Sequence, residues 1–239
     1  MLESMEGRVV LVTGAARGMG KAIAQMFSKR GARLGLLDAL EEELRCVVAE
    51  IREEGGEVLG KVVDVRQSDQ VETAVKKIAN QFGPIDILVN SAGLGMPGRI
   101  EELSEADWDL CFDVNVKGTF LVCRAVVPMM KKRKEGQIIN VASLAAWTRG
   151  NTARSCYGAS KYAVRGFSRF LAVELRSENI KVCCLSPGST DTHFRGEPTG
   201  KPNWMKPEDV AETVLFIASQ RDKVAVAELG VSMVMEGWG

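Results

Sequence analysis

A phenol, an ammonium group and a hydroxyl are spaced along this chain so that they could act on one substrate oxygen. Tyr157 and Lys161 share one face if residues 157–176 are helical, and Ser143 lies upstream. A free tyrosine has a pKa of about 10, and a nearby lysine cation stabilises the phenolate and lowers that pKa. Ser143 could hydrogen-bond the same oxygen. This set predicts acid–base chemistry on an alcohol or carbonyl, although Tyr and Lys at this spacing also occur on ordinary half-buried helices.

A glycine-rich loop, Thr-Gly-Ala-Ala-Arg-Gly-Met-Gly at residues 13–20, follows the first apolar run. Glycines let the backbone approach a pyrophosphate, and the N-terminus of the next helix offers free N–H groups and partial positive charge. The spacing is G-x-x-x-G-x-G rather than G-x-G-x-x-G, and no Gly-Lys-Ser/Thr completes a Walker loop. The loop therefore indicates either a phosphate site or a purely structural glycine turn.

Asp38 strengthens the interpretation as a dinucleotide site. It stands about twenty residues beyond the glycine loop, at the end of the second apolar run, where a carboxylate can accept from ribose hydroxyls. A 2′-phosphate would be repelled there and Ala39 adds no cation, so Asp38 favours NAD over NADP. Arg17 argues the other way, because it could reach a 2′-phosphate from the loop. Capping of the next helix by Asp38 is compatible with both.

Apolar runs of strand length alternate with amphipathic segments of helix length along the whole chain. We expect strands at 9–12, 32–38, 58–65, 85–90, 137–141 and 182–186. We expect helices at 18–30, 41–54, 71–82, 110–132, 157–177 and 207–219. The alternation predicts right-handed βαβ units, and near-continuous apolar strands predict a parallel sheet covered on both faces. Without repeats or Pro/Gly-rich linkers, residues 1–239 are expected to form one doubly wound α/β domain.

Polar residues follow the predicted strands at their carboxyl ends, where ligands bind in such sheets. They are Thr13-Gly14, Asp38, Asp64, Asn90-Ser91-Ala92-Gly93, Ser143 and Pro187-Gly188. Because these loops are separate in sequence but meet at one edge of the predicted sheet, we expect them to build one site.

The composition argues against several classes of partner. The 31 Lys+Arg balance 31 Asp+Glu, so no strong net field attracts nucleic acid or an acidic membrane surface. No signal peptide or membrane-spanning stretch is expected. The six cysteines form no C-x-x-C pair and no zinc spacing, which is typical of free thiols in a reducing cytosol. We expect a cytoplasmic protein without a metal. The basic run 131–134 is expected to be a solvated helix end, with docking of an acidic carrier protein as the alternative.

Together these residues resemble the short-chain dehydrogenase/reductase family, in its compact single-domain branch. The ordered motifs are Thr13-Gly14-x-x-x-Gly18-x-Gly20, Asn90-Ser91-Ala92-Gly93, Asn115, Ser143, Tyr157-x-x-x-Lys161 and Pro187-Gly188. They lie within a resemblance that runs from about Arg8 to Val234. The resemblance implies a Rossmann-like fold with a central, mostly parallel sheet of about seven strands and a nicotinamide cofactor.

The resemblance also implies a role for each residue. Tyr157 would be the general acid/base, Ser143 would hold the substrate oxygen, and Lys161 would bind the nicotinamide ribose and lower the Tyr157 pKa. Asn115 would position a water that links Lys161 to solvent. The implied cofactor contacts are Gly14, Arg17, Gly18, Met19, Gly20, Asp38, Asp64, Val65, Asn90, Ala92, Gly93, Tyr157, Lys161, Pro187, Gly188 and Thr192. The expected reaction is hydride transfer between NAD, with NADP as the less favoured cofactor, and a small alcohol or ketone.

The substrate pocket is expected to be mainly hydrophobic. Its predicted lining is Leu94, Met96, Leu144, Ala145, Trp147, Ser189, Phe194 and Trp204, with Arg149 and Arg154 in the loop before Tyr157. His193, the only histidine, is expected to be a pocket wall rather than a base. A modest hydrophobic alcohol or ketone fits this lining best, while a steroid, a sugar and a β-ketoacyl thioester stay open.

Three departures from the family pattern bear on the substrate. Ser91 replaces the second Asn of the usual Asn-Asn-Ala-Gly, and the stretch between Ser143 and Tyr157 is slightly longer than usual. The C-terminal segment resembles members that end in a Glu-Leu-x-Val-type strand rather than carrier-protein reductases.

Three alternative functions stay open. They are an NADPH-dependent reductase like the 3-oxoacyl-carrier-protein reductases, a member of the epimerase/dehydratase branch, and a non-catalytic NAD(H) sensor. The resemblance further implies a homotetramer, or a dimer, paired through the helices at 110–132 and 157–177.

Overall fold

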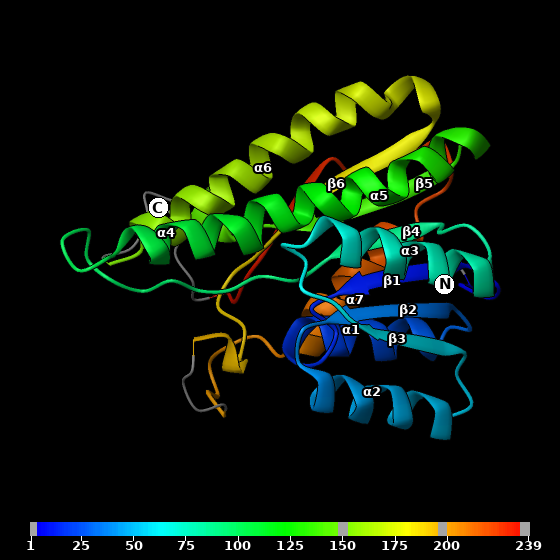
Figure 1. Ribbon diagram of the computed structural model, residues 1–239, viewed down its shortest axis with the longest axis horizontal. Helices are drawn as coiled ribbons and strands as arrows, with labels where there is room; N and C mark the ends of the chain where they lie inside the picture. The colour runs from blue at the N-terminus through cyan, green and yellow to red at the C-terminus, as the bar shows by residue number, and fades with distance from the viewer. Residues whose placement is uncertain (1–3, 148–152, 196–199, 235–239) are drawn as a thin grey trace.

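A seven-stranded parallel sheet forms the centre of the protein (Figure 1). The computed structural model describes residues 4–147, 153–195 and 200–234. The strands are β1 (Val9–Thr13), β2 (Arg33–Asp38), β3 (Val58–Val62), β4 (Ile87–Asn90), β5 (Gly136–Val141), β6 (Ile180–Pro187) and β7 (Glu228–Val231). Their spatial order is β3-β2-β1-β4-β5-β6-β7, and every neighbouring pair is parallel. The predicted doubly wound, Rossmann-like α/β fold is therefore confirmed, with every described strand parallel.

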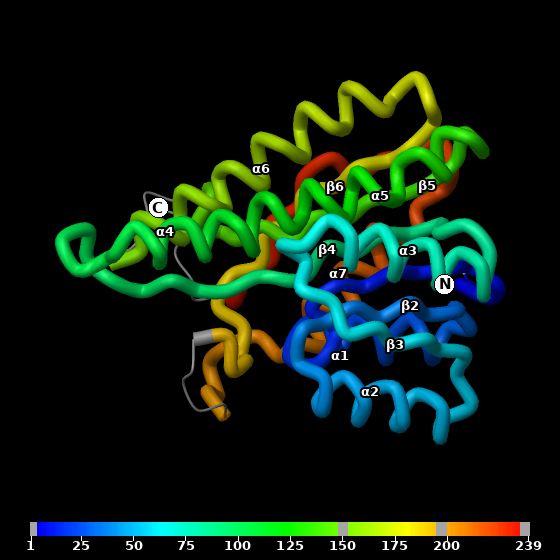
Figure 2. The backbone as a smooth tube through the Cα atoms, in the orientation of Figure 1, coloured from blue at the N-terminus to red at the C-terminus, as the bar shows by residue number. Residues whose placement is uncertain are grey.

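Helices cover both faces of the sheet, as Figure 2 shows. The α-helices are α1 (Gly18–Ser28), α2 (Glu41–Glu53), α3 (Ser68–Phe82), α4 (Glu105–Phe112), α5 (Gly118–Arg133), α6 (Ser155–Leu175) and α7 (Pro207–Ala218). A π-helical turn, η1 (Asp113–Lys117), joins α4 to α5, and the 3₁₀ turns are η2 (Leu144–Ala146), η3 (Arg176–Glu178) and η4 (His193–Arg195). Helices α1, α2 and α7 pack on one face of the sheet, and α3, α5 and α6 pack on the other.

Strand β1 shows why the strands read as continuous apolar runs. Its residues are all buried, with Val10 and Val12 in the core beneath α1, α2 and α7. Val9 and Leu11 belong to the opposite core, beneath α3, α5 and α6. Because successive side chains point to opposite faces and both faces are covered, each position must be apolar.

The strand order reverses between β1 and β4, which opens a crevice at the carboxyl ends of these strands. Thr13 Oγ1 ties the two loops at this point, accepting from Ser91 N at 3.2 Å and Ala92 N at 3.0 Å. Gly14 has φ +67°, and a Cβ there would lie 2.7 Å from Ala92 Cα. Only glycine satisfies both the left-handed backbone and the close approach of the two loops.

The predicted helix at 110–132 is interrupted and begins earlier than expected. Ser104 starts α4, since its Oγ accepts from Asp107 N at 3.1 Å and Asp107 Oδ2 accepts from Ser104 N at 3.0 Å. This capping box was not used in the prediction. The π turn η1 then widens the helix around Asn115, whose carbonyl accepts from Thr119 Oγ1 at 2.8 Å. Such turns are rare and often lie at functional sites.

Two smaller expectations need correction. The third strand ends at Val62 instead of residue 65, because the chain turns at Asp64, whose carbonyl accepts from Gln67 N at 3.0 Å. The basic run at 131–134 is not wholly solvated. Arg133 Nη1 lies 2.8 Å from Asp86 Oδ1, because the end of α5 packs against the start of β4.

The six cysteines are free thiols, and five of them are buried. Within the part of the chain that the structure describes, no group of His, Cys, Asp or Glu has the arrangement of a metal site. No helix in those residues is long and apolar enough to cross a membrane.

Candidate active site

The predicted site residues converge on one cavity of about 1490 Å³ at the carboxyl ends of the strands. Those lining it are Gly14, Arg17, Gly18, Met19, Gly20, Asp38, Asp64, Val65, Ala92, Gly93, Ser143, Tyr157, Lys161, Pro187, Gly188 and Thr192. Asn90 and Asn115 do not line it and are buried behind its wall. The volume exceeds that of a pocket for one drug-sized ligand, so a cofactor and a substrate fit together.

Helix α6 carries Tyr157 and Lys161 into this cavity on adjacent turns. Lys161 is only 4% exposed, and its Nζ donates to Val141 O at 3.0 Å. The same Nζ lies 5.8 Å from the centre of the Tyr157 ring, which meets Phe194 edge-on at 5.9 Å. Burial lowers the pKa of Lys161 from 10.5 to about 8. At neutral pH the tyrosine therefore has a buried ammonium group beside it.

Ser143 follows β5 and begins the 3₁₀ turn η2. Its backbone is extended, and its Oγ accepts from Ala145 N at 3.1 Å. Accepting this bond fixes the rotamer of the side chain and leaves the hydroxyl hydrogen to donate. Ser143 thus offers a hydrogen-bond donor to the cavity that Tyr157 also lines.

Asn115 is 1% exposed and holds the loop after β4 in place. Its Oδ1 accepts from Leu94 N at 2.8 Å, and its Nδ2 donates to Leu94 O at 3.0 Å. Nδ2 also donates to Ser160 Oγ at 3.0 Å. A Cβ on Gly93 would lie 3.1 Å from Asn115 Oδ1 and 3.5 Å from Lys161 Nζ. The side chains of Asn115 and Lys161 therefore both lie next to Gly93, which lines the cavity.

The side chain of Asn90 points into the core. Its Nδ2 donates to Asn140 Oδ1 at 2.9 Å, and Asn140 Nδ2 in turn donates to Ser168 Oγ at 2.9 Å. This buried network joins β4 and β5 to α6. Any contribution of Asn90 to a ligand site must come through the backbone that follows it.

The glycine loop fits an anionic ligand. Helix α1 begins at Gly18, its first turn holds no acidic residue, and Arg17 at the N-cap makes no capping bond with its side chain. A Cβ on Gly20 would lie 2.0 Å from Gly14 O, so the helix packs tightly onto the loop. The N–H groups at this end of α1 border the cavity, which is the arrangement that binds a pyrophosphate.

Asp38 lies at the end of β2 and supports the glycine loop. Its Oδ2 accepts from Ala16 N at 2.9 Å and its Oδ1 from Leu40 N at 3.0 Å. The N-cap of α2 is Leu40, so the interpretation of Asp38 as that cap was wrong. Each carboxylate oxygen keeps further lone pairs, and Asp38 lines the cavity. The carboxylate can therefore still accept from a ligand hydroxyl.

Asp64 is paired with Arg66, which the sequence reasoning missed. Arg66 Nε donates to both carboxylate oxygens at 3.0 and 2.9 Å, and the guanidinium lowers the pKa of Asp64. Both residues line the cavity next to Val65. The only signal in the sequence was the spacing Asp-x-Arg, which by itself is too common to single out.

The wall beyond Ser143 and Tyr157 combines apolar side chains with several polar and charged ones. Of the predicted pocket residues, those lining the cavity are Leu94, Leu144, Ala145, Arg154, Ser189, His193, Phe194 and Trp204. Met96 and Trp147 are not part of the lining, and Arg149 lies outside the described residues. Trp147 is turned away because its Nε1 donates to Ser186 Oγ at 2.9 Å. The lining residues missed from the sequence include Arg99, Ile100, Glu101, Leu110 and Tyr162, which come from the loop after β4 and from α4 and α6.

Comparison with known proteins matches a model of the short chain dehydrogenase family to residues 8–202. The (2S)-[(R)-hydroxy(phenyl)methyl]succinyl-CoA dehydrogenase subunit BbsD of Thauera aromatica is 40% identical, over 90% of each chain. The 3-oxoacyl-[acyl-carrier-protein] reductase of Thermotoga maritima is 35% identical, over 94% of this chain and 96% of its own.

Two solved structures have nearly the same fold. An alcohol dehydrogenase from Thermococcus sibiricus, complexed with 5-hydroxy-NADP, superposes with a TM-score of 0.90 at 31% identity, over 96% of this chain and 98% of its own. A short chain dehydrogenase from Mycobacterium paratuberculosis, bound to NAD, has a TM-score of 0.89 at 28% identity, over 96% and 97%.

Proposed function

The chain belongs to the short-chain dehydrogenase/reductase family of NAD(P)-dependent oxidoreductases, and from this premise we propose that it is an NAD-preferring enzyme that interconverts a hydrophobic secondary alcohol and its ketone. One observation carries the proposal: Tyr157, Lys161 and Ser143 line the same cavity as the glycine loop at the start of α1. That arrangement places a proton-transfer group, a cation and a hydroxyl donor beside the site for an anionic cofactor.

Proton transfer is assigned to Tyr157. In the oxidising direction its phenolate takes the proton of the substrate hydroxyl, and in reduction its hydroxyl returns that proton. Ser143 donates a hydrogen bond to the same substrate oxygen and stabilises the negative charge that develops there. A nicotinamide cofactor held at the glycine loop would supply or accept the hydride, and the proton transfer by Tyr157 requires no metal.

Lys161 supports the negative form of Tyr157. Its Nζ lies 5.8 Å from the centre of the Tyr157 ring, and a cation this close favours the phenolate over the neutral phenol. Val141 O holds the ammonium group in place, and among the residues that the structure describes no carboxylate forms an ion pair with it. We assign to Asn115 the positioning of a water next to Lys161, supported by the contact of both residues with the wall at Gly93.

The preference for NAD rests on Asp38. The carboxylate lies at the cavity edge and would repel a 2′-phosphate by several kcal/mol at contact distance. Arg66 is already paired with Asp64, which leaves Arg17 as the cation on the glycine loop that could oppose this effect. One of the similar solved structures contains 5-hydroxy-NADP and another contains NAD. These structures therefore do not decide the cofactor, and the proposed preference for NAD depends on Asp38 and Arg17.

The apolar part of this wall, which includes Leu94, Leu144 and Phe194, supports a substrate with a bulky hydrophobic group on the carbon that bears the oxygen. The Thauera aromatica relative is named for a succinyl-CoA substrate with a phenyl group on that carbon, and the phenyl group agrees with this choice. A second candidate is an NADPH-dependent 3-oxoacyl reductase like the Thermotoga maritima relative. Asp38 counts against it, because NADPH carries the 2′-phosphate.

We further propose a homotetramer, or a dimer, that buries the outer face of α5 and α6. Phe170 is 79% exposed, Val173 61% and Phe120 43%, so this face presents large apolar side chains. On the same two helices, Leu121, Val122, Cys123 and Leu171 are buried within the chain and are not available for a contact.

The test is reduction of a panel of aryl ketones, cyclic ketones and β-keto esters with NADH, followed by absorbance. Tyr157→Phe should lower kcat by at least about 100-fold, because the proton donor is lost. Thr73→Ala is the control, since it removes an exposed hydroxyl from α3, outside the cavity lining, and should change kcat less than threefold. Full activity in Tyr157→Phe would refute the mechanism. NADH binding without reduction of any ketone would instead favour the sensor.

A further inference from the structure

We propose that Arg165 is a positioning residue that keeps the Ser143 hydroxyl at a fixed position relative to Tyr157. The inference rests on the proposed function, because it concerns the group that binds the substrate oxygen. Ser143 does not lie on a regular element. It begins the three-residue turn η2, so something must fix that turn relative to α6. Arg165 makes this connection.

The guanidinium of Arg165 reaches the far end of the turn. Its Nη1 donates to Ala146 O at 2.8 Å. The turn is closed by Ala146 N donating to Ser143 O at 2.9 Å and by Ala145 N donating to Ser143 Oγ at 3.1 Å. A shift of the Ala146 carbonyl would therefore carry Ser143 with it, and would weaken the bond that sets the direction of its hydroxyl.

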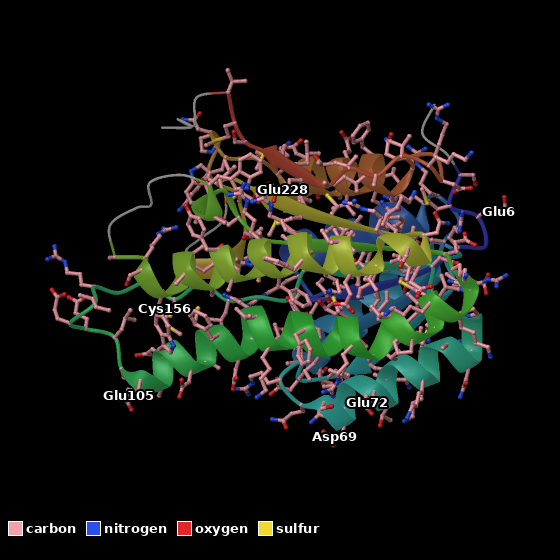
Figure 3. The ribbon with its side chains drawn as sticks, turned by 90° about the horizontal axis from the view of Figure 1, so that it is seen from above. Glu6, Asp69, Glu72, Glu105, Cys156 and Glu228 are labelled. Atoms are coloured by element: carbon pink, nitrogen blue, oxygen red, sulfur yellow. The ribbon has the colours of Figure 1, made fainter. Side chains whose placement is uncertain are left out.

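The rest of the guanidinium is held on two further sides. Nη2 lies 3.0 Å from Glu228 Oε2, and Nε lies 3.4 Å from Glu228 Oε1. Glu228 belongs to β7 and is labelled in Figure 3, beside α6. The Trp147 ring covers the guanidinium at 4.5 Å, while its own Nε1 is bonded to Ser186. A planar group with donors fixed in a fork and a ring on its face has little freedom to move.

The same helix carries the other half of the site. Tyr157, Lys161 and Arg165 are spaced four residues apart on α6, and therefore lie on one stripe of the helix. The helix thus fixes the acid–base group directly and the Ser143 turn through Arg165. This explains how two residues on different elements can share one substrate oxygen with little freedom.

Arg169 provides a matched control. It pairs with the same carboxylate, with Nε 3.1 Å from Glu228 Oε1, but its side chain is 66% exposed. Within the described residues, no hydrogen bond joins Arg169 to the Ser143 turn. Removing Arg165 also leaves Glu228 paired with Arg169, so no isolated buried charge remains.

The experiment compares wild type, Arg165→Met, Arg169→Met, Ser143→Ala and the double variant Ser143→Ala/Arg165→Met, using NADH and the best ketone from the panel above. Arg165→Met should lower kcat roughly 10- to 100-fold, with the Kd for NADH unchanged within twofold. Ser143→Ala should lower kcat roughly 100-fold or more. Since Arg165 acts through Ser143, the double variant should be no slower than Ser143→Ala, and Arg169→Met should resemble wild type.

Crystal structures of wild type and Arg165→Met give a readout that needs no substrate. The expected result is loss of the bond from Ala145 N to Ser143 Oγ and displacement of η2. An unmoved turn, or losses in kcat that multiply in the double variant, would overturn the positioning role. Normal activity of Ser143→Ala, or no ketone reduced by wild type, would instead overturn the proposed function, and the crystal structures would still decide the role of Arg165.

Discussion

Replacing Lys161 by methionine should abolish activity and at the same time stabilise the folded protein. The ammonium group is 4% exposed, has Val141 O as its hydrogen-bond acceptor, and has a pKa lowered by burial from 10.5 to about 8. At 1.36 kcal/mol per pH unit, this lowering corresponds to about 3 kcal/mol of destabilisation while the lysine is charged. Methionine fills similar space without the charge.

The gain in the free energy of unfolding from Lys161→Met should decrease as the pH rises. Below pH 8 the lysine is protonated in the folded and unfolded states, so wild type carries the full cost of burying the cation. Between pH 8 and 10.5 the unfolded state binds more protons, and the stability of wild type rises with pH. Above pH 10.5 the lysine is neutral in both states. The advantage of the methionine variant should therefore be largest at pH 7 and disappear above pH 10.5.

Loss of the hydrogen bond to Val141 O offsets part of this gain, by about 1 kcal/mol. The net increase in the free energy of unfolding at pH 7 is then about 2 kcal/mol. Urea denaturation of both proteins at one concentration, between pH 6 and 10.5, measures it. Lys117→Met is the control, because Lys117 is 51% exposed and should give no such gain. A methionine variant less stable at pH 7, or a difference independent of pH, would refute the reasoning.

Further changes test the loop, the thiols and the subunit contact. Gly14→Ala combines a positive φ with a backbone clash, so it should lower the free energy of unfolding by more than about 2 kcal/mol and abolish NADH binding. Gly55→Ala is the control, because Gly55 has φ +84° in open space and its substitution should cost about 1 kcal/mol. Thermal unfolding of the two variants measures both losses of stability. A thiol reagent should modify one cysteine, Cys46, in the native protein and six after denaturation; rapid reaction of more would contradict the burial of the others. Phe170→Glu should lower the mass measured by light scattering, unlike Val62→Glu on β3, and an unchanged mass would exclude this face as the contact.

The fold was predictable because two independent patterns agreed. Apolar strands such as β1 are buried on both faces, which gives a run without alternation, and helix-length segments separate them. The sites at the carboxyl ends follow from the topology: once the strands are parallel, Gly14, Asp38 and Ser143 must lie at one edge. The alternation of strands and helices along the chain therefore already predicts that these residues lie together.

Other features depend on contacts between distant residues. Trp147 looked like a pocket residue from its position, but its indole bonds to Ser186 on β6 and lies over Arg165 on α6. The pairing of Arg66 with Asp64 and the support that Asp38 gives to Ala16 likewise depend on side-chain direction. Periodicity reports which face a residue occupies and cannot report the partner that it finds there.

Titration of the protein with NADH and with NADPH measures the cofactor preference assigned to Asp38. Trp204 lines the cavity, so energy transfer from tryptophan to the reduced nicotinamide can report binding. Both should bind, with NADH tighter by at least about tenfold, or about 1.4 kcal/mol, and Asp38→Asn should reduce this difference in affinity. Tighter binding of NADPH would contradict the role of Asp38, and binding of neither would contradict the assignment of the cavity to a nicotinamide cofactor.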